Sequence, residues 1–84
     1  MNLLKLFSQK RKFLKQFQKA YIYEIAKVEI DIELYGSMSD EQVVGQDTSG
    51  AEPKDMTAKD ALKTSLVNHR IFTDRLNAVN NLLK

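Results

Sequence analysis

The 84-residue chain contains no cysteine, no tryptophan and one histidine, His69. Without thiols it forms no disulfide bond, and one imidazole falls short of the ligand set that a structural zinc site requires. Its apolar runs are far shorter than the roughly 18 residues of a membrane span, and the apolar segment at its start is too short for the core of a secretory signal. We therefore expect an intracellular (cytoplasmic) protein, or one within an assembled particle, that uses no metal or cofactor.

The small size of the chain limits what it can do alone. A domain of this length buries only about 60% of the surface that its unfolded chain exposes. Disulfides and metals are excluded as stabilising elements, so self-association or a partner protein is the remaining source of stability. No nucleophile has a recognisable spacing from His69, so the sequence predicts neither an enzyme nor a small-molecule substrate.

The charges are strongly segregated, although the net charge is only +2. Residues 1–20 carry six basic side chains and no acidic one, whereas residues 21–42 carry six acidic side chains against Lys27 alone. On a helix this order opposes the macrodipole, so it does not stabilise an isolated helix. Two antiparallel copies would instead place each basic half beside an acidic half.

Apolar residues recur with one helical periodicity from the basic segment into the acidic segment. Its members are Leu3, Phe7, Leu14, Phe17, Tyr21, Ile25, Val28, Ile32 and Tyr35. Their helical spacing predicts one long helix over about residues 3–35, with Gly36 as its C-terminal stop.

A connector of about twenty residues follows, and it contains the only proline, Pro53. Ser39 and Gln42 have the spacing of a short turn within it. Thr57, three residues before Asp60, predicts the start of a second helix over about residues 57–83. The main stripe of this helix is Ala58, Leu62, Leu66, His69, Phe72, Leu76, Val79 and Leu83.

Residues 26–35 allow an alternative interpretation as a β-strand, which would make the fold α+β. Their sequence, AKVEIDIELY, also alternates apolar and charged residues with a period of two. A lone strand has no obvious partner except the weak segment at Gln42 to Val44, and an isolated two-stranded hairpin is marginally stable. We therefore favour the helix.

Each predicted helix carries a second apolar stripe away from its main one. The stripes are Ile22, Ala26, Ile30 and Leu34 on the first helix, and Val67, Ile71, Ala78 and Leu82 on the second. A single two-helix hairpin would leave both stripes in water. The prediction is an all-α fold in one domain, residues 1–84: an antiparallel, coiled-coil-like helical hairpin that oligomerisation completes.

These features predict a small non-enzymatic assembly or adaptor protein that acts through helix-mediated protein contacts. We expect the second stripes to form the protein interface of a homo-oligomer, with antiparallel contacts between first helices, or of a larger assembly. The size and composition would suit an accessory or minor structural protein of a phage or other mobile element.

The basic segment supports an alternative function, electrostatic binding of nucleic acid without sequence specificity. Arg11, Lys12, Lys15 and Lys19 form the candidate polyanion-binding face. A helical wheel directs Phe13, Phe17 and Tyr21 into packing, so stacking on bases is not expected. The same segment also has the form of a cationic amphipathic helix on a membrane surface, but the stripe continues past residue 21, which favours burial against protein.

Overall fold

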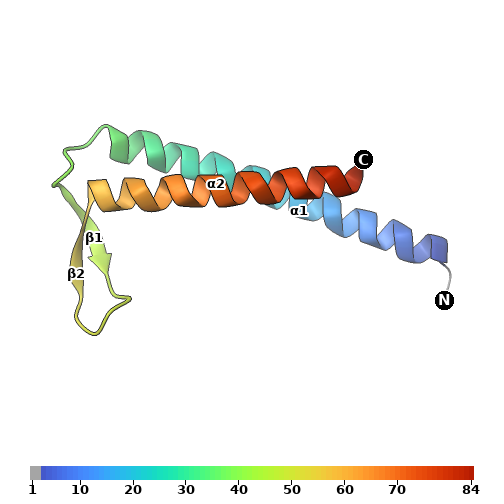
Figure 1. Ribbon diagram of the computed structural model, residues 1–84, viewed down its shortest axis with the longest axis horizontal. Helices are drawn as coiled ribbons and strands as arrows, with labels where there is room; N and C mark the ends of the chain where they lie inside the picture. The colour runs from blue at the N-terminus through green and yellow to red at the C-terminus, as the bar shows by residue number, and fades with distance from the viewer. Residues whose placement is uncertain (1–2) are drawn as a thin grey trace.

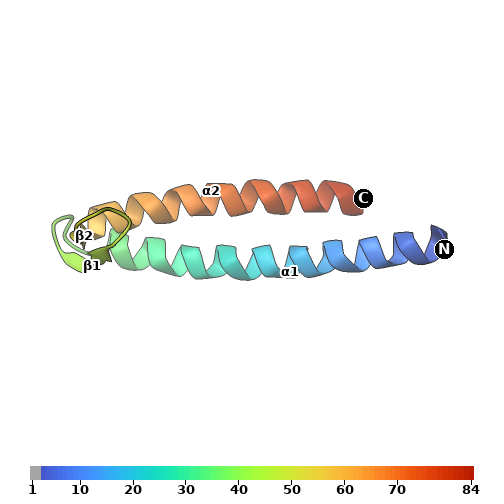
Figure 2. The same ribbon diagram turned by 90° about the horizontal axis from the view of Figure 1, so that it is seen from below.

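The computed structural model describes residues 3–84, with side chains from Ser8 onward. The elements along the chain are helix α1 (Leu3–Gly36), strand β1 (Val43–Asp47), strand β2 (Lys54–Thr57) and helix α2 (Ala58–Leu83). The helices lie side by side and antiparallel, with the two-stranded sheet at one end (Figures 1 and 2). The N-terminal turns of α1 extend past the C-terminal end of α2 (Figure 1).

Both long helices predicted from the periodicity are confirmed, within one or two residues at each end. Residues 26–35 continue α1 without interruption, so they are not a strand. Gly36 is the last residue of α1, as expected, but no glycine of residues 3–84 has a positive φ. Instead, the Ser37 hydroxyl donates to the Leu34 carbonyl at 2.7 Å and the Ser37 N–H donates to the Glu33 carbonyl at 3.2 Å.

The connector is not only a loop, so the all-α class was incomplete. β1 and β2 pair antiparallel, with Gln46 opposite Asp55 and an irregularity in register at Val44. The Asp47 carboxylate accepts hydrogen bonds from the hydroxyl and backbone N–H of Ser49 at 2.6 and 3.0 Å, and these bonds lower the pKa of Asp47. Pairing and this turn satisfy polar backbone groups of a segment that has few apolar side chains.

The start of α2 is tied to the connector by three contacts. The N–H of Ala58 donates to the Gln42 carbonyl at 2.7 Å, and the N–H of Lys59 donates to the Asp40 carbonyl at 3.1 Å. The Thr57 hydroxyl accepts from the N–H of Asp60 at 3.3 Å, which confirms the predicted N-cap. These contacts use N–H groups that the first turn of a helix leaves without internal partners.

The seam between the helices follows a heptad-like pattern. The seam positions of α1, all buried or half-buried, are Leu14, Gln18, Tyr21, Ile25, Val28, Ile32 and Tyr35; Glu24 and Asp31 are half-buried as well. The buried or half-buried positions of α2 include Ala58, Ala61, Leu62, Ser65, Asn68, His69, Phe72, Leu76, Val79 and Leu83. Alternating steps of three and four residues keep the α1 positions facing α2 along its length.

Three side-chain pairs cross the seam and fix which residues lie opposite each other. The Gln18 amide donates to the Asn80 side-chain oxygen at 2.7 Å, and the rings of Tyr21 and Phe72 lie 6.3 Å apart between centroids. Nearer the sheet, His69 Nε2 lies 3.1 Å from Glu29 Oε1. Asn80 therefore lies in the seam, bonded to Gln18 of the other helix.

The core along this seam is thin. Among the described side chains, only Val28, Ala58, Ala61, Ser65 and Val79 are buried, and no large one is fully enclosed. The radius of gyration is 17.9 Å, whereas a compact domain of this length has one of about 12 Å. One layer of two helices has no interior in which a large side chain can be surrounded.

We expect Ala61→Leu to destabilise the hairpin by about 1–3 kcal/mol, because Ala61 is 5% exposed in the seam and a larger side chain would push the helices apart. The matched control is Ala78→Leu, on the exposed side of the same helix, which should change the free energy of unfolding by less than about 0.5 kcal/mol. Urea denaturation followed by circular dichroism measures both, and equal effects would contradict the assigned seam.

Candidate functional site

The second stripe of α1 lies on the surface of the single chain. Ile22, Ile30 and Leu34 are 52%, 67% and 47% exposed, and Ala26 is exposed between them. All four lie away from the seam, because the seam uses Tyr21, Ile25 and Val28 on the opposite part of the helix. The structure therefore leaves this apolar stripe without an intramolecular partner.

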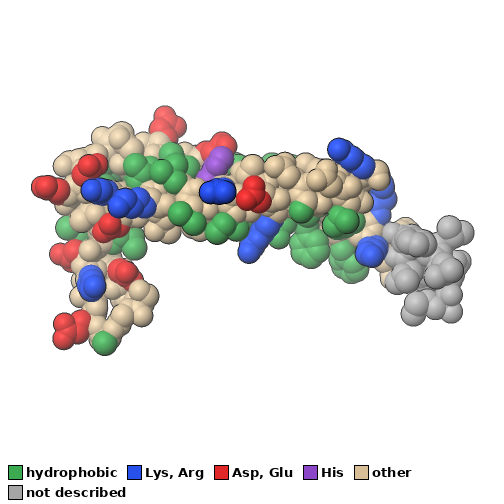
Figure 3. Space-filling model, viewed as in Figure 1, with side chains coloured by type: hydrophobic (Ala, Val, Ile, Leu, Met, Phe, Trp, Pro, Cys, Tyr) green, Lys and Arg blue, Asp and Glu red, His purple; other side chains and the backbone are tan. Residues whose placement is uncertain are grey.

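The second stripe of α2 is also exposed, and its C-terminal end lies beside α1. Val67, Ile71, Ala78 and Leu82 are all exposed, and Leu82 lines a shallow hollow with Lys10, Arg11 and Leu14 of α1. Figure 3 shows hydrophobic side chains along the lower edge of α2 and near its C-terminal end. Asp74 and Arg75 interrupt this stripe between Ile71 and Ala78.

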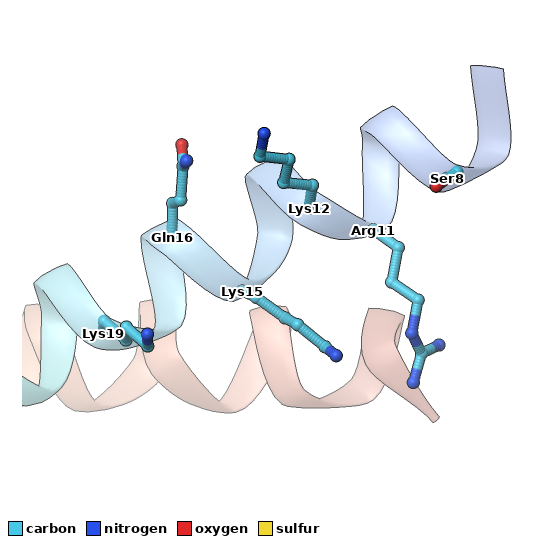
Figure 4. A pocket seen from close by; sticks show the side chains of 6 residues that line it. All are labelled: Ser8, Arg11, Lys12, Lys15, Gln16 and Lys19. Carbon is cyan, nitrogen blue, oxygen red and sulfur yellow. The ribbon is translucent and has the colours of Figure 1, made fainter. Parts of the chain in front are cut away.

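The basic residues of α1 surround a second open hollow of about 460 Å³. Its lining residues are Ser8, Arg11, Lys12, Lys15, Gln16 and Lys19. The side chains diverge in Figure 4, where Lys12 and Gln16 point to one side of the helix and Arg11 and Lys15 point to the other. This arrangement can attract an extended polyanion, but it does not converge on one small anion.

One of the four candidate cations has a structural contact. Arg11 Nη1 donates to the Leu83 carbonyl at 3.3 Å, at the C-terminal end of α2, where the negative end of the helix dipole stabilises a positive charge. Within the described part of the chain, Lys12, Lys15 and Lys19 form no ion pair; the pairs are Lys27 with Glu24 and His69 with Glu29. The three lysines are therefore the free charges of this face.

Three of the four basic residues and most of the apolar stripe belong to a single row along α1. The row faces away from the seam except at Arg11, whose guanidinium reaches the end of α2. We call the outer row the residues Arg11, Lys15, Lys19, Ile22, Ala26, Ile30 and Glu33, which follow one another at steps of three or four. At 100° per residue such a row stays on one side of a straight helix. From the N-terminal to the C-terminal end of α1, the outer row is therefore basic, then apolar, then acidic.

Two predictions about aromatic and aliphatic packing were wrong. Phe13 and Phe17 are more than half exposed, and Leu66 of the predicted α2 stripe is exposed as well. Only Tyr21 of the three rings packs, against Phe72. The apolar arc of each helical wheel is wider than the strip that one partner helix can cover, and polar Gln18 and Ser65 occupy seam positions instead.

The described residues show no feature of a metal or membrane-spanning site. They contain no cluster of three or more potential metal-ligating side chains. No helix in this part of the chain combines the length and hydropathy needed to cross a bilayer. His69 contacts Glu29 in the seam. Side chains of Leu3, Lys5, Leu6 and Phe7 lie outside the described residues.

Two features of these surfaces were not recognised from the sequence. The Arg11 contact to the end of α2 requires knowledge of how far the helices overlap, so no sequence signal indicates it. The continuity of the outer row does have a signal, the unbroken steps of three and four from Arg11 to Glu33.

Comparison with known proteins finds no matching protein family, no matching curated protein and no matching solved structure.

Proposed function

We propose that the chain is a small non-enzymatic assembly or adaptor protein that binds other helices through its exposed apolar stripes. It would act in a homo-oligomer or a larger protein assembly, as an accessory or minor structural protein of a phage or other mobile element would. The observation that carries this proposal is the exposure of Ile22, Ile30 and Leu34 on α1 and of Val67 and Leu82 on α2.

The energetic reason is the large share of aliphatic side chains left in water. Complete burial of an Ile, Leu or Val side chain contributes about 1.5–3 kcal/mol relative to exposure. Single exposed aliphatic residues are common on protein surfaces. Ile22, Ala26, Ile30 and Leu34 instead repeat every four residues along one helix, which is the ridge that packs into the groove of another helix.

We expect the double substitution Ile30→Lys and Leu34→Lys to weaken association at least roughly 100-fold, because it places charges in the apolar stripe. Neither side chain contributes to the seam, so the helical circular dichroism spectrum should be unchanged. Sedimentation equilibrium from about 5 to 500 µM measures the oligomeric state.

The matched control is Asn77→Lys with Asn81→Lys, which adds the same charge at the same spacing on exposed positions of α2. This control should associate like the native chain. A native chain that stays monomeric over the whole range, or equal weakening by both double variants, would contradict the proposal.

A second candidate function is polyanion binding by Arg11, Lys12, Lys15 and Lys19. The favouring observation is that the three lysines, in the described part of the chain, have no carboxylate within ion-pairing distance around the 460 Å³ hollow. Nucleic acid would bind through its phosphates, because the diverging side chains of Figure 4 supply charge without a fixed hydrogen-bonding pattern.

For this function we expect Lys12→Glu, Lys15→Glu and Lys19→Glu together to abolish retention on a heparin column at low salt. Lys59→Glu, Lys63→Glu and Lys84→Glu give the same change of net charge elsewhere and should retain most of the binding. Equal elution of the two triple variants would show that net charge, and not this face, causes retention.

A further inference from the structure

The outer row of α1 is complementary to itself when it is reversed. Counting outward from Ala26, Ile22 and Ile30 lie four residues to either side, and Lys19 and Glu33 lie seven residues to either side. α1 ends at Gly36, ten residues from Ala26, so the overlap of two copies would span residues 16–36. A second copy turned end for end would therefore meet apolar residues with apolar residues and cations with carboxylates.

We infer that the partner of the α1 surface is a second copy of this chain, bound antiparallel about a two-fold axis that passes beside Ala26. This inference rests on the proposed function and specifies its partner and register. Ala26 would face Ala26 of the second copy, Ile22 would face its Ile30, and Lys19 would face its Glu33.

Exposure and free charge support this pairing. Ile22 and Ile30 are more than half exposed and Ala26 is exposed between them, so a second helix can approach without displacing any seam residue. In the part of the chain that the structure describes, Lys19 and Glu33 each lack an intramolecular ion pair. Both groups are thus available to a second copy.

Charge also selects the direction of the pairing. A parallel pair would place the basic residues 11–19 of one copy beside the same residues of the other, and like charges repel. An antiparallel pair centred on Ala26 separates the two basic segments and places Lys19 opposite Glu33, near the acidic end of α1. The α2 stripe lacks such a gradient, because Arg70, Asp74 and Arg75 alternate in sign along it.

A small side chain at the centre permits close approach of the two backbones. Ala26 leaves room between the flanking isoleucines of the two copies, as small residues do where helices cross. The apolar part of the row is short, so the interface is small, and we expect a dissociation constant on the order of 10 µM or weaker. A covalent trap is therefore a better test than mass alone.

The cysteine-free sequence makes this trap specific, because an introduced thiol is the only one in the chain. Ala26→Cys should form an intermolecular disulfide under mild oxidation at least roughly 10-fold faster than Lys63→Cys, an exposed position on α2, since a disulfide requires Cα atoms within about 7 Å. A mixture of Ile22→Cys and Ile30→Cys should cross-link faster than either variant alone. Circular dichroism should show the same helical content for all four variants.

Charge reversal gives a second measurement that does not depend on oxidation. Lys19→Glu and Glu33→Lys should each weaken the association roughly 10-fold, and the two together in one chain should restore it, because each exposed pair acts twice across the two-fold axis. A merely structural role of either residue would not produce this rescue.

Three results would overturn the inference. The first is a rate of disulfide formation for Ala26→Cys no faster than that for Lys63→Cys. The second is faster cross-linking of Ile22→Cys with itself than with Ile30→Cys. The third is no rescue of association by the double charge reversal. If such a result accompanies a native oligomer that Ile30→Lys with Leu34→Lys abolishes, the proposed function stands and only the partner geometry is wrong. If the native chain is monomeric at all concentrations and no cross-link is preferred, both the proposed function and the proposed pairing are wrong.

Discussion

A hairpin of two helices has one seam, and this constraint governs the rest of the structure. Each helix can present only a strip of its surface to the other, so the large side chains in the seam keep at least one side open to solvent. Ala58 and Ala61 are buried because they are small, whereas Tyr21, Phe72 and Leu76 are only half-buried. Aliphatic residues outside the strip remain exposed, and these supply the candidate interaction surfaces.

The outer row of α1 connects the charge order of the sequence to a geometry of assembly. Basic residues near the N-terminus and acidic residues near the C-terminus of α1 oppose its macrodipole, so their order does not stabilise the helix itself. The order becomes favourable when the acidic end of another helix lies beside the basic end. Polyanion binding would use the same face, so the two functions would compete for Lys19.

The two-stranded sheet explains how a connector of this length is accommodated. Its strands pair with each other, and the carbonyls of Asp40 and Gln42 accept hydrogen bonds from the first N–H groups of α2. The contacts hold the connector against the start of α2 with little apolar burial.

The sequence by itself determined the two long helices, the N-cap at Thr57 and the end of α1 at Gly36, because these depend on spacing and capping between near neighbours. It also placed the second stripes, which the structure finds exposed. Only the tertiary structure decided that Gln18 and Ser65 lie in the seam while Phe17 and Leu66 do not, because the covered strip depends on how the helices meet. The pairing of β1 with β2 and the contact of Arg11 with the end of α2 were likewise decided there, since both join groups that no local sequence pattern brings together.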